Sequence, residues 1–147
     1  MADAIGPAVG GPYVAAAVFC EKVLQERDGV ASLIRIIDRT TVTALGKDAP
    51  EDPSVTLEQT LFLSFKAGFA RGKMTVAIQP VSPSGQRLPA VTTDVLFEGD
   101  DRGVNLVFQM KLEAKEDGLY WFDVSVEQQL ITRVPYRVLY QRIAHRS

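Results

Sequence analysis

Hydrophobic and polar residues alternate along most of this chain, which is the pattern of half-buried β-strands. Residues 104–112 and 119–126 show it most clearly, because each stretch carries an apolar side chain at every second position. Short segments rich in Gly, Pro, Asp and Ser separate such stretches, as turns do between strands. The pattern therefore predicts an all-β protein.

The first apolar stretch, 13–24, fits both a helix and a strand. Ala16, Phe19 and Val23 fall at helical spacing, whereas Val14, Ala16 and Cys20 fall on one side of a strand. We favour a strand, because Asp-Gly at 28–29 is a hairpin turn signal before a β-branched run. The other predicted strands are 31–38, 57–66, 73–79, 92–97, 104–112, 119–126 and 134–140.

The connections between these strands are predicted from Gly, Pro and acidic residues. Loops are expected at 46–54 and 80–86, a short connection between Gly68 and Gly72, and a turn at 98–103. Pro135 cannot donate a ladder hydrogen bond, so the last strand should lie at a sheet edge or turn that position to solvent.

About eight short strands joined by turns predict an antiparallel β-sandwich of two sheets rather than a closed barrel. A single domain at 13–141 is expected, after a flexible N-terminal arm at 1–12 and before a polar C-terminal tail at 142–147. The residues expected to face inward are Val104, Leu106, Phe108, Met110, Tyr120, Phe122, Val124, Tyr136 and Val138.

Composition narrows the class of protein and of partner. The 147 residues suffice for one core, and a single cysteine excludes an intramolecular disulfide, which favours a reducing, cytoplasmic location. A net charge of −2, from 16 basic and 18 acidic residues, predicts neither nucleic acid nor an anionic membrane as partner. The longest apolar run, 13–20, is far shorter than the about 20 residues of a membrane-spanning helix.

Residues 117–122, Asp-Gly-Leu-Tyr-Trp-Phe, resemble the Asp-x-Gly-x-Tyr-x-Cys corner of immunoglobulin-like domains. In that motif the tyrosine hydroxyl bonds back across the turn, and the resemblance implies this role for Tyr120. Phe122 stands where the cysteine of the motif would be. The implied architecture is immunoglobulin-like without a disulfide.

A wider resemblance runs through 19–24 and 28–39 and resumes at 118–138. Phe-Cys-Glu-Lys-Val-Leu and Asp-Gly-Val-Ala-Ser-Leu-Ile-Arg-Ile-Ile-Asp-Arg are its first two segments. These segments resemble a bacterial family of small, uncharacterised single-domain β-sandwich proteins. The resemblance implies a fold, and it brings no catalytic residue to this chain.

Candidate residues for chemistry are few. His145 is the only histidine and is predicted to be a solvated tail residue, while Cys20 is predicted to be buried, with a reactive thiol as the alternative. The acids at 98–101 and 48–52 match no calcium loop and are predicted to be solvated turns, with calcium bridging of the two as the alternative. The sequence therefore predicts no catalytic residue, no metal ligand and no cofactor, and a protein that is not an enzyme.

One group of apolar side chains is expected to point outward. If Tyr120 and Phe122 face the core, their neighbours on the strand face away from it. Tryptophan is enriched in binding hot spots, so this side is the candidate interaction face. Its predicted members are Leu119, Trp121, Val107, Pro135 and Leu139. The alternative is that the N-terminal arm or the 44–56 loop covers them.

The sequence thus favours a non-enzymatic protein-interaction or assembly module. Its partner would be another protein or a second copy of the chain, bound through the tryptophan face or through the edge strand ending at Tyr140. A small-ligand or carbohydrate-binding sandwich is the first alternative, although few aromatic residues are available as a platform. An enzyme is the second.

Overall fold

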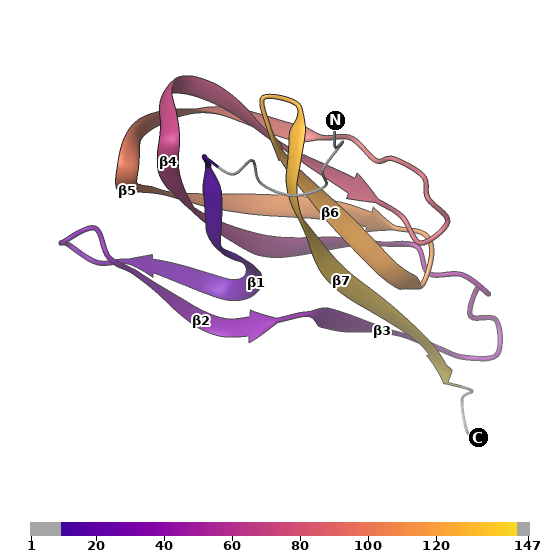
Figure 1. The fold of residues 1–147 in the computed structure, drawn as a ribbon. Coiled ribbons are helices and arrows are strands. Elements are labelled where there is room, and N and C mark those ends of the chain that lie inside the picture. The colour runs from indigo at the N-terminus through magenta and orange to yellow at the C-terminus, as the bar shows by residue number, and fades with distance from the viewer. Residues whose placement is uncertain (1–9, 144–147) are drawn as a thin grey trace.

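The computed structural model describes residues 10–143 and consists of strands and their connections (Figure 1). Within this range there is no helix, and so none that could cross a membrane. The predicted all-β class is confirmed, and 13–24 is a strand. The strands are β1 (Tyr13–Gln25), β2 (Ala31–Ile37), β3 (Arg39–Leu45), β4 (Val55–Val81), β5 (Val91–Ala114), β6 (Gly118–Val126) and β7 (Gln129–Ile143).

The strands form two facing layers joined by β4 and β5. The ladder order is β2-β1-β4-β6-β7-β3, and β5 pairs with β4 along both halves. The first half of β4 pairs with β1 and the second half with β6, so the two halves belong to different layers. One layer therefore holds β1, β2 and the adjoining halves of β4 and β5, and the other holds β6, β7, β3 and the remaining halves.

The bends of β4 and β5 correct two predicted connections. Gly68 and Gly72 lie inside the continuous strand β4, and residues 98–103 lie inside β5. Register shifts around Gly68, together with positive φ at both glycines, bend the paired strands without ending the ladder. Figure 1 shows the two strands curving over together at one side. The connections predicted at 68–72 and 98–103 are therefore bends inside two strands that stay paired with each other.

Arg71 spans this bend. Its guanidinium donates to the Glu98 carbonyl at 2.9 Å and to an Asp100 carboxylate oxygen at 3.3 Å. A Cβ on Gly99 would lie 2.4 Å from the guanidinium carbon, so the glycine leaves room for the arginine. The acidic turn predicted at 98–101 thus carries an ion pair with a basic residue of the neighbouring strand, and both of its side chains are exposed.

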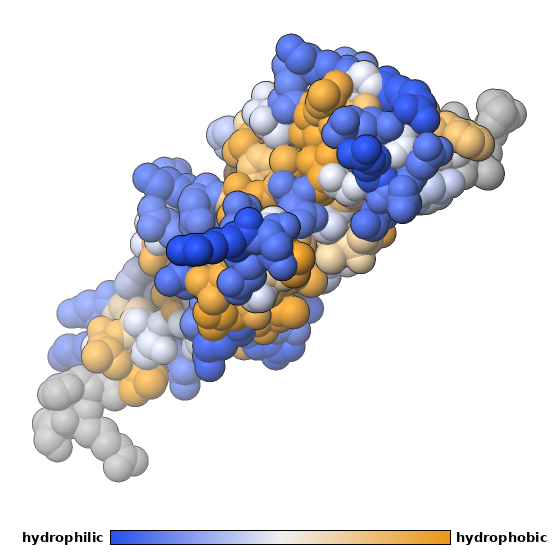
Figure 2. Space-filling view, turned by 90° about the vertical axis from the view of Figure 1, so that its left-hand side faces the viewer, coloured by the Kyte–Doolittle hydropathy of each residue, from blue (hydrophilic) through white to orange (hydrophobic). Residues whose placement is uncertain are grey.

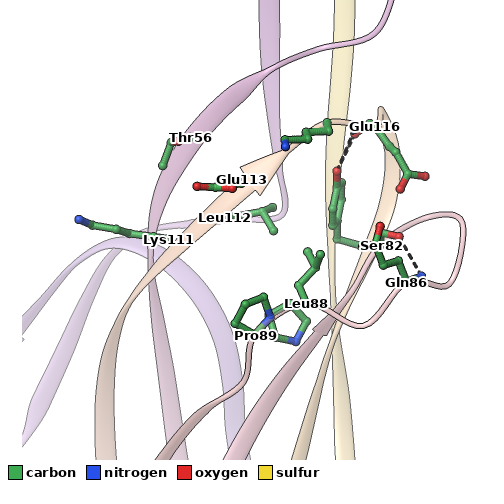
Figure 3. A pocket seen from close by; sticks show the side chains of 12 residues that line it. Thr56, Ser82, Gln86, Leu88, Pro89, Lys111, Leu112, Glu113 and Glu116 are labelled. Atoms are coloured by element: carbon green, nitrogen blue, oxygen red, sulfur yellow. Dashed lines mark hydrogen bonds between the residues drawn. The ribbon is translucent and has the colours of Figure 1, made fainter.

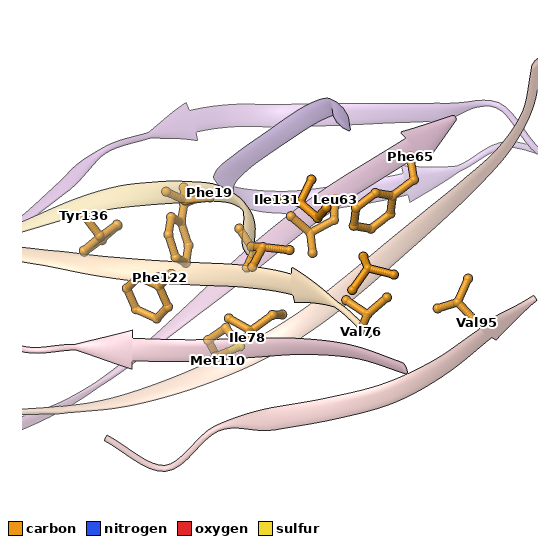
Figure 4. Packing of buried hydrophobic residues seen from close by; sticks show 14 of the residues in the cluster. Phe19, Leu63, Phe65, Val76, Ile78, Val95, Met110, Phe122, Ile131 and Tyr136 are labelled. Carbon is orange, nitrogen blue, oxygen red and sulfur yellow. The ribbon is translucent and has the colours of Figure 1, made fainter. Parts of the chain in front are cut away.

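Aromatic rings join the two layers (Figure 4). Phe19 of β1 lies 4.8 Å from Phe122 of β6 and 4.9 Å from Tyr136 of β7, measured between ring centroids, in edge-to-face contact. These strands share no ladder with β1, so the contacts run from layer to layer. The inward set predicted from the sequence is confirmed, since all its members belong to this core or pack against it: Val104, Leu106, Phe108, Met110, Tyr120, Phe122, Val124, Tyr136 and Val138.

Strand β3 is not predicted by the sequence, and it makes the sandwich not wholly antiparallel. It pairs in parallel with β7, from Arg39 opposite Arg137 to Leu45 opposite Ile143. Only Asp38 separates β3 from β2, which lies in the other layer. The chain changes layer without a glycine or proline, so no local signal marks the break.

Strand β7 lies between β6 and β3, so it is not an edge strand along most of its length. The Arg137 N–H donates to the Asp38 carbonyl at 2.9 Å, and alternate residues of β7 face β3 in the same way. The nitrogen of Pro135 faces this flank too, just before β3 begins pairing. The missing donor of Pro135 therefore costs no ladder bond.

The two ends of the predicted domain shift slightly. Of the expected arm, only Gly10–Pro12 are described; the Phe69 N–H donates to the Gly10 carbonyl at 2.6 Å, and Pro12 is buried. At the other end β7 reaches Ile143, so 142–143 belong to a strand rather than to the expected tail. His145 lies outside the described residues.

Candidate interaction face

The outer face of the second layer carries the tryptophan. Trp121 of β6 lies opposite Val81 of β4 and Pro135 of β7, which makes an apolar row across three strands. Leu119 precedes Trp121 on the same side of β6, and Leu139 lies diagonally across from Leu119 on β7. Four of the five predicted residues thus come together with one that was not predicted. We call Val81, Leu119, Trp121, Pro135 and Leu139 the Trp121 face.

The indole of Trp121 is half-buried by its own chain. The Arg133 guanidinium carbon lies 4.7 Å from the ring centroid, and Arg133 Nε donates to Asp123 Oδ1 at 2.6 Å. A cation over an indole contributes on the order of 0.5–1 kcal/mol at an exposed site. The cover on this ring is therefore an arginine of the neighbouring strand. The loop after β3 packs instead against Tyr140, whose hydroxyl donates to the Pro50 carbonyl at 2.7 Å.

Val107 does not join the Trp121 face. It lies on the second half of β5, opposite Phe62 of β4, which in turn lies opposite Val18 of β1. This row belongs to the outer face of the first layer, because β5 changes layer at its bend. Val107 is exposed there, whereas Phe62 is buried beside it.

Cys20 also lies on the outer side of the first layer. It follows the inward-facing Phe19, lies opposite Ile36 of β2 and Thr60 of β4, and is 0% exposed. Burial raises the pKa of the Cys20 thiol, and a backbone hydrogen bond with Lys22 opposes this shift only in part. The predicted burial is confirmed, and a thiol held protonated is a poor nucleophile.

Exposed apolar side chains elsewhere are more scattered. Phe69 is 86% exposed and Leu96 is 61% exposed, both near the bends of β4 and β5. On the side of the molecule where these strands bend, hydrophobic patches alternate with hydrophilic ones (Figure 2). Single exposed apolar residues are common on proteins, so a contiguous row such as the one at Trp121 is the more informative feature.

The turn before β6 forms the tyrosine corner that the sequence implies. The Tyr120 hydroxyl donates to the Glu116 carbonyl at 2.7 Å and accepts from the Glu116 N–H at 3.3 Å. Burial raises the pKa of Tyr120, and the backbone bond with Glu116 opposes the shift. The Glu116 carboxylate accepts from the N–H and hydroxyl of Ser84, at 3.1 and 2.9 Å. The corner thus ties the turn to the loop after β4.

A cavity of about 430 Å³ opens beside this corner, at one end of the sandwich. Leu88 and Pro89 of the loop and Leu112 of β5 supply its apolar lining (Figure 3). Thr56, Lys111 and other polar residues surround them. Figure 3 shows the Lys111 side chain extending away from Leu88 and Leu112. A cavity with an apolar floor and polar surroundings is suited to a small amphiphilic molecule.

Metal-binding side chains are not gathered in the described part of the chain. Within residues 10–143, no three His, Cys, Asp or Glu side chains are placed to hold a metal ion. The acids at 48–52 are exposed, and at the bend of β5 Asp100 pairs with Arg71.

The sequence model of one protein family matches residues 15–139, which is most of the chain. This chain belongs to DUF6941, a family of unknown function. The predicted membership of an uncharacterised β-sandwich family is thereby confirmed. The stretch matched to DUF6941 contains all of the Trp121 face and the tyrosine corner.

A search of curated proteins finds no match to this DUF6941 chain. Among solved structures, an immunoglobulin-like protein from Pseudomonas aeruginosa is similar to it, at 15% identity and a TM-score of 0.39. That alignment covers 89% of this chain and 99% of the other.

Two neighbours of Trp121, Val81 and Arg133, are not predicted from the sequence. Val81 stands between two prolines in what reads as a loop, so its place in the ladder opposite Trp121 is not evident. Arg133 could be found, because it precedes Pro135 by two residues and must share its side of β7. What the sequence does not give is the pairing that brings Arg133 next to Asp123 and over the indole.

Proposed function

We propose that this protein is a non-enzymatic interaction module that binds a partner protein through the Trp121 face. The observation that carries the proposal is the apolar row of Val81, Trp121 and Pro135 on the outer side of a sheet. Tryptophan and arginine are both enriched among residues that dominate binding energies. Because Arg133 already holds one side of the indole, little side-chain freedom is lost when a partner contacts it.

The charges around the Trp121 face indicate what the partner carries. Arg133 is paired with Asp123, and Arg39 of β3 is paired with Asp38 at 3.0 Å. Arg137, opposite Leu119 and Arg39, makes no ion pair with any side chain among residues 10–143. A matching surface therefore combines an apolar contact for the indole with an acidic group facing Arg137.

Affinity capture from the native cell tests this function. Two variants, Trp121→Ala and Leu139→Asp, change the face, and Leu96→Asp is the matched control, because Leu96 is an exposed leucine on β5 of the same layer. We expect the partner recovered by the wild type and by Leu96→Asp to fall about tenfold or more with the two face variants. Equal recovery by all four proteins would rule out this face.

A small-ligand site is the second candidate function, and it is supported by the cavity beside the tyrosine corner. Among residues 10–143, Tyr120 is the one aromatic residue that lines this cavity, and it is 1% exposed, so it offers no stacking surface for a sugar. A small amphiphile fits the lining better. Thermal-shift screening of such compounds tests it: a true ligand raises the Tm of the wild type and loses this effect in Leu88→Trp, which fills the cavity.

A further inference from the structure

Strand β3 leaves one edge of the second layer open. It is the last strand in the ladder order and pairs with β7 on one side only. Two bonds fix the orientation of its backbone: the Arg137 N–H donates to the Asp38 carbonyl, and the Gly46 N–H donates to the Ile143 carbonyl, both at 2.9 Å. Because backbone groups alternate in direction along a strand, the even-numbered residues of β3 bond to β7 and the odd-numbered ones face away.

The outward-facing residues form a row of unused ladder groups. No strand among residues 10–143 pairs on this side of β3, and all four residues are exposed. Each contributes one N–H and one C=O, so the edge presents four donors and four acceptors. The residues are Arg39, Thr41, Thr43 and Leu45.

The other sheet edges are less suited to pairing. In β2, Arg35 adopts a φ of 54° in the middle of the strand, and β5 bends at Asp100, where φ is 56°. Irregular backbone of this kind interrupts an edge and discourages strand addition. Within Arg39–Leu45 no residue has a positive φ, and none is a proline, a lysine or an acid. The two halves of β5 are regular on either side of this bend, but they carry charged residues along the edge, namely Asp94, Glu98, Lys111 and Glu113. Among the edge strands β2, β3 and β5, β3 thus combines a regular backbone with the absence of proline, lysine and acid.

The inner side of β3 is anchored. Thr40 Oγ1 shares a hydrogen bond with the Tyr136 hydroxyl of β7 and accepts from Gln59 Nε2 of β4 at 3.2 Å. Tyr136 is 0% exposed, so the anchor lies in the core between the two layers. A strand held in this way keeps its edge in one conformation before any partner arrives.

We propose that this edge pairs antiparallel with the same edge of a second copy, about a two-fold axis at Val42. The proposal goes beyond the interaction function proposed above, because it uses the edge of β3 and not the Trp121 face. Thr41 then lies opposite Thr43 of the second copy, and Arg39 opposite Leu45. Each such pair exchanges two hydrogen bonds, so all four donors and all four acceptors of each copy are used.

The side chains of β3 complement themselves in this register. Threonine opposite threonine is a favourable cross-strand pair, and no residue faces a like charge. The antiparallel arrangement brings Asp38 at one end of the edge near Lys47 beyond the other end of its neighbour. Val42 packs against the core, and its side chain meets the same side chain of the second copy at the axis, which extends the apolar interior.

Introducing like charges on the edge tests the dimer. We expect light scattering with size-exclusion chromatography to give twice the 16.1 kDa of one chain for the wild type as its concentration rises. Thr41→Lys/Thr43→Lys places lysines opposite lysines and should give the monomer mass, as should the corresponding double glutamate variant. Mixing the two variants restores the dimer mass. Ser32→Lys, on the edge strand β2, is the control that keeps the wild-type behaviour.

A cysteine scan tests the register. Val42→Cys places two thiols at the axis, in a non-hydrogen-bonded pair where Cα atoms are about 4.5 Å apart, and should cross-link on oxidation. Ala44→Cys faces Thr40 of the second copy and should not. The native Cys20 is 0% exposed and does not compete.

Two results overturn the proposal: a wild type that stays at 16.1 kDa at every concentration, or a lysine double variant that still dimerises. The first result with the partner still captured through Trp121 removes the dimer alone. If the wild type dimerises but the Trp121-face variants recover as much partner as the wild type does, the proposed function alone is removed.

Discussion

Replacing Tyr120 by phenylalanine removes one oxygen atom from the tyrosine corner and leaves the ring in place. The hydroxyl is bonded to both backbone groups of Glu116, and the tyrosine is 1% exposed. In Tyr120→Phe these backbone groups lose their partner in a part-buried turn. A buried polar group without a partner costs about 1–3 kcal/mol, so we expect the free energy of unfolding to fall by about 1.5–2 kcal/mol.

The same free energy can be expressed as a change in Tm. An unfolding entropy of about 2.1 cal/mol/K per residue amounts to about 0.31 kcal/mol/K for 147 residues, so the Tm of Tyr120→Phe should fall by about 5–6 °C. Tyr140→Phe is the matched control, because its hydroxyl donates to the Pro50 carbonyl in an exposed place. Water replaces that bond, and we expect a fall of no more than about 2 °C.

Urea unfolding followed by the fluorescence of Trp121, the single tryptophan, measures both variants. The midpoint should fall for Tyr120→Phe while the m-value stays at that of the wild type, because the surface exposed on unfolding is unchanged. If Tyr120→Phe loses no more stability than Tyr140→Phe, the corner bond does not stabilise the turn and the reasoning fails.

Three further predictions follow from the core and from the shifted pKa values. Phe19→Ala should lower the free energy of unfolding by about 3–5 kcal/mol, and Ile36→Ala, at an exposed site, by about 0.5 kcal/mol or less; equal losses would contradict the assigned core. Burial raises the pKa of Tyr120 and of Tyr136 above 10.0, so the folded state keeps these protons up to a higher pH than the unfolded state does. Denaturant melts should therefore show that the contribution of these two tyrosines to stability is constant well below pH 10.0 and falls as the pH rises through and above 10.0. Tyr120→Phe should reduce this fall. Finally, the thiol of Cys20 should react with a disulfide reagent only as fast as the protein opens, which a comparison with the urea-unfolded chain measures.

The strand pattern alone suffices for much of the core. Tyr120, Phe122 and Val124 alternate with outward neighbours, and a period of two assigns them to one face whatever the partner strands are. The tyrosine corner is similarly local, since its donor and acceptor lie four residues apart at Tyr120 and Glu116. Features whose geometry is set within a few residues are those that the sequence predicts.

Features that depend on distant pairing are not predicted. Gly68 and Gly72 permit positive φ in a hairpin and in a bent strand alike, and only the pairing of β4 with β5 across the bend decides between them. The placement of Val107 follows from that ambiguity, because the bend sends its half of β5 into the other layer. Strand β3 is missed for a related reason: its partner β7 lies at the other end of the chain, and the run through Asp38 has no break.

The Trp121 face and the β3 edge belong to the same layer, which leads to a last prediction. Leu139 of the face lies opposite Thr41 of the edge, so a dimer joined at β3 would hold two Trp121 faces on one continuous sheet. Five strand spacings separate the two copies of β6, which places the faces about 24 Å apart. On a surface dense in the captured partner, such a dimer binds twice and dissociates more slowly than a single chain. Thr41→Lys/Thr43→Lys should therefore dissociate about tenfold faster or more than the wild type in surface plasmon resonance, although its Trp121 is untouched, and the two should converge when the partner is sparse. Equal dissociation at both densities would mean that the two faces act separately.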